Sequence, residues 1–298
     1  MISVLLSGVG LAGCSTTPTT DAAPTSTVAR GEPGAPSSTA VPIGTTDATV
    51  DRRRTSSATA LIDASGNAST GAVDSLVATS FTDHDPSTDG SRSAFLTAWA
   101  NGPRRTPVRT LIDGDLVGVH STSGGPSADV HFDLFRVDAE LVVEHWSAHQ
   151  SSAAPNPAGR TLVDGPTDIT DRDRTTENRK LVQRLMTEVF GVGAFDQFPT
   201  FTKDGAYLQH NPALGDGVAA IQGLMASLSP PGGAAFRYHA THKVVADGNF
   251  VLAQSEGRIG SSVVAYYDLF RVADGAIAEH WDVVAPVPPG SVNPNPPF

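Results

Sequence analysis

Hydrophobic residues in the C-terminal half of the chain follow two different spacings. Over 176–190 and again over 216–228, apolar side chains recur every three or four residues, which predicts two amphipathic helices. The second run ends at Pro-Pro-Gly-Gly, residues 230–233. Asp-Gly pairs at 247–248 and 274–275 then indicate hairpin turns. The segments predicted to be strands are 236–246, 250–256, 263–272 and 276–284. Helices followed by an antiparallel meander favour an α+β fold.

An internal repeat relates this half to the preceding one. Phe-Thr-Asp-His-Asp-Pro at 81–86 corresponds to Tyr-Leu-Gln-His-Asn-Pro at 207–212, and Asp-Leu-Phe-Arg-Val at 133–137 recurs at 268–272. Glu-His-Trp occurs at 144–146 and again at 279–281. Because the matches keep their order over about 65 residues, we infer that one domain has been duplicated.

The N-terminal 48 residues differ in composition from the rest. Residues 2–12 are small and apolar, too short to span a bilayer, and typical of the hydrophobic part of a signal peptide. They end in Leu-Ala-Gly-Cys, which resembles the lipobox of bacterial lipoproteins. That resemblance implies that Cys14 is acylated and anchors the chain to the extracytoplasmic face of the cell membrane. Residues 15–48 are rich in Ser, Thr and Pro and contain no aromatic residue, which predicts a disordered tether.

Charge and cysteine content narrow the function classes. The net charge of -11 argues against nucleic acid as a partner, since an acidic surface repels phosphates. A single cysteine excludes an intrachain disulfide and a thiolate metal cluster. The predicted organisation is a signal peptide at 1–14, a tether at 15–48, a first domain at 49–150, a linker at 151–172, a second domain at 173–286, and a frayed Pro-rich tail at 287–298.

The second copy resembles the SnoaL-like family of the nuclear transport factor two-like superfamily through 207–212, Asp216-Gly217 and 268–282. The first copy resembles it over its later two-thirds. The resemblance implies a cone-shaped α+β barrel in each copy, with helices packed in a curved antiparallel sheet. Characterised members are polyketide cyclases that use an aspartate as acid/base and no metal, so no cofactor is expected. Asp282 matches the acid/base position, whereas the first copy has Ser147 there and is interpreted as degenerate.

The predicted pocket depends on strand register. His280 and Asp282 are two residues apart on a strand, so they share a face. A three-residue loop at 273–275 would pair 272 with 276 and place Asp268 on that face, whereas a two-residue loop would turn Asp268 away. We favour the first register because it collects acids, histidine and aromatics on one wall. The predicted catalytic residues are Asp282, Asp268, His280 and His210, and those predicted to contact the ligand are Tyr207, Tyr266, Phe270 and Gln254.

Three functions stay open at this point. The first is acid/base chemistry, of aldol or isomerase type, on a small carbonyl compound, with Asp282 as the base and His280 or His210 polarising the carbonyl. The second is non-catalytic binding of an apolar ligand at the cell surface. The third is a structural pseudo-dimer in which the two sheets pack together. A metal site of His210, His280 and Asp282 is conceivable, but no tight spacing supports it and none is predicted.

Overall fold

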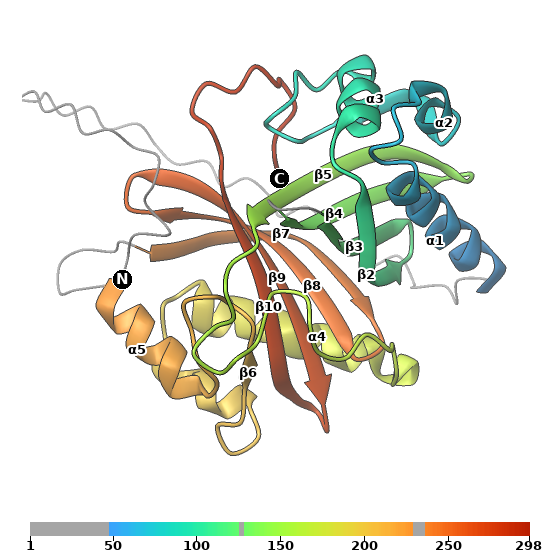
Figure 1. Cartoon of the computed structure of the whole chain (residues 1–298). Coiled ribbons are helices and arrows are strands. Elements are labelled where there is room, and N and C mark those ends of the chain that lie inside the picture. The colour runs from blue at the N-terminus through green and yellow to red at the C-terminus, as the bar shows by residue number, and fades with distance from the viewer. Residues whose placement is uncertain (1–47, 125–127, 229–235) are drawn as a thin grey trace, which may run out of the picture. The chain divides into compact units, whose positions relative to one another are not determined.

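The computed structural model describes residues 48–124, 128–228 and 236–298. The predicted signal peptide, Cys14, nearly all of the tether, and Pro-Pro-Gly-Gly at 230–233 lie outside these residues. Residues 44–298 form one compact unit that contains both copies (Figure 1). Within the described part of the chain, no helix has the length and apolar character needed to cross a membrane.

Each copy is a five-stranded mixed sheet with helices on its inner face (Figure 1). The first copy comprises α1 (Ala48–Asp63), α2 (Thr70–Asp74), β1 (Val77–Asp83), α3 (Arg92–Asn101), β2 (Arg105–Asp113), β3 (Leu116–Ser123), β4 (Asp129–Asp138) and β5 (Leu141–Ser151). The second comprises η1 (Arg172–Arg174), α4 (Thr175–Leu185), the π-helical η2 (Met186–Phe190), η3 (Phe195–Phe201), β6 (Leu208–Gln209), α5 (Val218–Leu228), β7 (Phe236–Asp247), β8 (Phe250–Ile259), β9 (Ser262–Ala273) and β10 (Ala276–Pro286).

The strand orders confirm the duplication. The first sheet runs β1-β5-β4-β3-β2 and the second β6-β10-β9-β8-β7, so each strand has its counterpart at the same place. In both sheets the first strand pairs in parallel with the last, and the other pairs are antiparallel. The fold is therefore α+β in two cone-shaped units, as the sequence predicts.

The turn between β9 and β10 differs from our expectation. Ala273 pairs with Ala276, so the loop is the two-residue Asp274-Gly275, with positive φ at both positions as a type I′ turn requires. The predicted face is nevertheless preserved. A bulge between Ile277 and Glu279 shifts the register by one further residue, so Asp282 lies opposite Asp268 and the two share a face, although the pairing differs from the expected one.

The two sheets pack against each other through their outer faces. One buried cluster contains Leu111, Phe132, Leu134 and Trp146 of the first copy together with Phe250, Leu252, Tyr267, Leu269 and Trp281 of the second. The contact is reciprocal at the rim. The Asp113 carboxylate accepts from the Ala246 amide at 3.0 Å, and the Asp247 carboxylate accepts from the Ile112 amide at 3.1 Å. This arrangement is the intramolecular pseudo-dimer that the repeat suggests.

Two segments interpreted from sequence as a linker and a frayed tail are packed. Leu162 of segment 151–172 is buried in the cluster between the sheets. In the tail, Asn293 Nδ2 donates to the carbonyl of Asp83 at 3.1 Å, and His84 Nδ1 lies 2.7 Å from the carbonyl of Pro296. The tail is therefore not frayed, because asparagine side chains satisfy backbone groups of the first copy.

Candidate functional site

The interior of the second copy brings three predicted residues together. Asp268 comes from β9, and His280 and Asp282 come from β10. All three are buried, and one ligand atom from each lies within 4.8 Å of the others. Two carboxylates and an imidazole at this spacing can exchange protons and can also hold a divalent ion.

Hydrogen bonds fix the proton on His280. Gln209 Oε1 accepts from the backbone amides of His210 and Asn211 at 2.8 and 2.9 Å, so this atom is the amide oxygen. His280 Nδ1, 3.1 Å from the same oxygen, must therefore carry a hydrogen. His280 Nε2 faces Asp268 Oδ1 at 3.1 Å. That contact needs a second proton, on the imidazole or on the carboxyl.

Asp282 is a buried carboxyl group whose pKa is raised. It is 8% exposed. Burial raises its pKa, the nearby charge of Asp268 adds to this, and the charge of His280 and a hydrogen bond from Asn211 oppose it. Asn211 Nδ2 donates to both carboxylate oxygens, at 3.0 and 2.8 Å. These contacts orient the carboxyl group without neutralising it.

Two tyrosine hydroxyls belong to the same polar cluster. Tyr238 donates to both oxygens of Asp268 at 3.1 and 3.0 Å. The Tyr207 hydroxyl interacts with the Gln209 amide but forms no well-aligned hydrogen bond with any described residue. Burial raises the pKa of Tyr207 well above its ordinary value, so this hydroxyl keeps its proton and can donate it in a hydrogen bond.

The structure places the other predicted residues on both faces of the sheet. Tyr207, Tyr266 and Phe270 belong to the interior cluster of the second copy. Gln254 does not: it pairs with Tyr267 on the outer face and donates to the Tyr267 hydroxyl at 2.8 Å. The pocket prediction is therefore wrong for Gln254.

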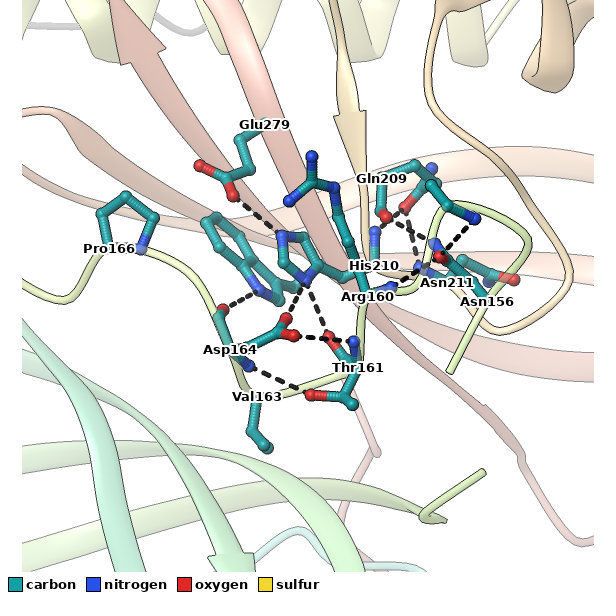
Figure 2. A network of polar contacts seen from close by, with 12 residues as sticks. Asn156, Arg160, Thr161, Val163, Asp164, Pro166, Gln209, His210, Asn211 and Glu279 are labelled. Carbon is teal, nitrogen blue, oxygen red and sulfur yellow. Dashed lines mark hydrogen bonds and ion pairs between the residues drawn. The ribbon is translucent and has the colours of Figure 1, made fainter. Parts of the chain in front are cut away.

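His210 also lies away from the interior cluster. It stacks on Trp281, with its Nε2 atom 2.8 Å from Glu279 Oε1 and its Nδ1 atom 2.7 Å from the carbonyl of Thr161 (Figure 2). His210 therefore does not join His280 and Asp282 as a possible metal ligand. Sequence reasoning missed Asn211, Gln209 and Tyr238, although the first two belong to the repeated motif at 207–212.

The first copy holds its equivalent histidine in a charged network. His145 Nδ1 lies 2.9 Å from Asp83 Oδ1, and Nε2 lies 3.0 Å from Asp133 Oδ1. Burial opposes the charge, but hydrogen bonds to the two aspartates raise the pKa of His145 to about 9. Arg105 Nη1 donates to both oxygens of Asp133 at 2.8 Å. His145 is therefore an imidazolium at neutral pH and cannot act as a base.

A cavity of about 180 Å³ adjoins this network. His131 and His149 line it, together with Phe95, Trp99 and Arg105. His131 is 2% exposed, and neither ring nitrogen has a hydrogen-bond partner among the described residues. Burial and the charge of Arg105 lower the pKa of His131 to about 4, so its imidazole is neutral at pH 7.

The His145 network makes stability depend on pH. Because the pKa of His145 is raised from 6.5 to about 9, its contribution is fully present below about pH 6.5 and is lost as the pH rises through about 9. We expect the free energy of unfolding, measured with urea, to fall between pH 7 and 10 more in the native protein than in His145→Gln. Parallel curves for the two proteins would contradict this.

No family model and no curated protein matches the chain. Solved structures resemble parts of it. A candidate ketosteroid isomerase from Kribbella flavida is 17% identical and covers 39% of this chain and 86% of its own, with a TM-score of 0.33. A candidate SnoaL-like polyketide cyclase from Jannaschia sp. CCS1 is 21% identical over 40% of this chain and 91% of its own, with a TM-score of 0.32. An NTF2-like protein of unknown function from Mesorhizobium loti is 20% identical over 40% and 96%, at 0.31. Similarity at this level assigns no activity.

Proposed function

We propose that the second copy catalyses proton transfer on a small carbonyl compound, with Asp282 as the base. The observation that carries this is the buried Asp282 carboxyl, whose pKa is raised, within a few ångströms of Asp268 and His280. A base whose pKa approaches the working pH abstracts a carbon-bound proton more effectively than an ordinary solvated aspartate.

The surrounding groups have complementary roles. Asp282 takes the proton next to the carbonyl, and the developing charge on the carbonyl oxygen accepts a hydrogen bond from the Tyr207 hydroxyl. His280, whose two ring nitrogens are bonded to Gln209 and Asp268, holds Asp268 beside the base, and its charge limits the rise in the pKa of Asp282. Returning the proton to another carbon is an isomerisation, and attack of the enolate on a second carbonyl is an aldol reaction. Phe270 and Tyr266 provide apolar walls.

The two copies divide the work in this proposal. Ser147 occupies the position of Asp282. The pKa of a serine hydroxyl is far too high for it to ionise at neutral pH, so Ser147 cannot replace the carboxylate as the base. His145 is fixed as an imidazolium by two aspartates, whereas its counterpart His280 has the neutral Gln209 in place of one of them. The first copy then supports the fold of the second through the shared core, and anchoring through Cys14 would hold both outside the membrane.

Non-catalytic binding of an apolar ligand is the alternative, and a titration separates the two. We expect the ¹³C carboxyl resonance of Asp282, followed by NMR in the whole chain, to titrate above the ordinary aspartate value of about 3.9. The whole chain is needed because the outer face of the second sheet is buried against the first copy. A midpoint at or below that value would remove the basis for Asp282 as a base and leave the binding role.

A further inference from the structure

The first copy places two histidines side by side on neighbouring strands. His131 of β4 and His149 of β5 are direct register partners, and both line the cavity of about 180 Å³. Their ring centroids lie 5.4 Å apart with an angle of 32° between the planes. In the second copy the same register positions hold Tyr266 and Val284. The histidine pair is therefore specific to the first copy and is not inherited from the shared fold.

Neither ring nitrogen of His131 has a hydrogen-bond partner among the described residues. Leaving a buried polar group without a hydrogen bond is unfavourable, so we expect a group other than the described protein residues at these two nitrogens. The His131 side chain also lines the cavity. His149 is exposed at the cavity edge, so an ion can reach the pair from solvent.

The geometry points to a metal-binding site: we propose that His131 and His149 together bind one divalent transition-metal ion, with water completing the coordination. Zn²⁺–nitrogen bonds of about 2.0–2.1 Å in tetrahedral geometry place two imidazole centroids about 5 Å apart, close to the spacing seen here. Imidazole nitrogen suits Zn²⁺, Cu²⁺ and Ni²⁺, whereas Mg²⁺ and Ca²⁺ prefer oxygen ligands.

The charge around the cavity favours a cation. The carboxylates in or beside it are Asp83, Asp85, Asp129 and Asp133, and the cations are Arg105 and His145. Arg105 lies near His131 and would repel an ion, but both of its contacts to Asp133 are hydrogen bonds of 2.8 Å that offset this charge. Asp129, two residues before His131 on β4, also lines the cavity and can bind a coordinated water.

Zn²⁺ titration of the whole chain by calorimetry tests the proposal, with Cys14→Ser in every protein to remove its one thiol. The variants are His131→Tyr and His149→Val, because each installs the residue that the second copy carries at that position. Exposed His239→Gln is the matched control, and His280→Gln reports on the other cluster able to hold an ion. Thermal unfolding without metal checks that each variant folds.

We expect His131→Tyr and His149→Val each to weaken Zn²⁺ binding at least tenfold, with His239→Gln and His280→Gln close to the parent. The side-chain NMR signals of His131 and His149 should shift together on adding Zn²⁺. No binding by the parent, or binding that only His280→Gln weakens, would overturn the proposal. Because His149 is exposed, His149→Val keeps the test decisive even if His131→Tyr does not fold. The outcome is independent of the acid/base role of Asp282.

Discussion

Asp282→Asn is expected to slow proton exchange on a ketone substrate by about 10²–10⁴-fold, the usual contribution of a general base. Asparagine keeps the shape of the side chain, but it cannot accept a proton from carbon. The measurement is the loss of α-proton NMR signal from small cyclic ketones in D₂O, with the whole chain as catalyst. It needs no knowledge of the natural substrate, because enolisation is the step common to isomerase and aldol chemistry.

The control for that experiment is Asp274→Asn in the β9–β10 turn. Asp274 is exposed, and asparagine tolerates its positive φ of 53°, so exchange should proceed at the parent rate. Equal exchange by Asp282→Asn and the parent would exclude Asp282 as the base. A parent protein that exchanges no faster than buffer, while the ketones still bind, would favour the binding role instead.

The sequence predicted which face carries Asp268, His280 and Asp282, but it did not predict the turn. The expected three-residue loop is a two-residue type I′ turn, and the face is restored by a bulge between Ile277 and Glu279. Residues 276–280 contain no glycine or proline, so the sequence gives no signal for this bulge. Asp268 reached the correct wall because burial of the aromatic and apolar residues on each face fixes the register more strongly than the turn does.

The errors at His210 and in the tail have local causes. β6 covers only Leu208–Gln209, and alternation from Tyr207 and Gln209, both turned inward, puts His210 on the outer side. The motif at 207–212 was interpreted as one functional unit because the alternation of side chains along a strand was not applied to it. In the tail, a Pro-rich composition suggested fraying, but the Asn-Pro-Asn-Pro sequence at 293–296 supplies side-chain amides that bind the first copy. Composition alone does not show where such donors find acceptors.

Arg109→Ala is expected to lower the free energy of unfolding by about 3–5 kcal/mol, because two charged hydrogen bonds and the contact with the Trp281 ring are lost together. Arg109 is almost fully buried between the two sheets. Its Nε and Nη2 atoms donate to the carbonyls of Pro166 and Asp164 at 2.8 and 2.7 Å, and the guanidinium lies 4.1 Å from the ring centroid of Trp281. Burial lowers its pKa to about 10, opposed by Glu279 and Asp164, so it stays charged at pH 7.

The repeat supplies a matched variant for this test. Lys243 of β7 lies 3.9 Å from the ring centroid of Trp146, the counterpart of Trp281, but it is only half-buried. Lys243→Ala should therefore cost about 0.5–1 kcal/mol, the value of one partly exposed cation–π contact. Urea unfolding of both variants measures the difference. Similar losses in the free energy of unfolding for the two variants would mean that the hydrogen bonds from Arg109 to the carbonyls of segment 151–172 add little stability. A large loss of unfolding free energy for Arg109→Ala alone would show that one buried cation links segment 151–172 to both copies. The sequence had suggested that this segment is only a linker.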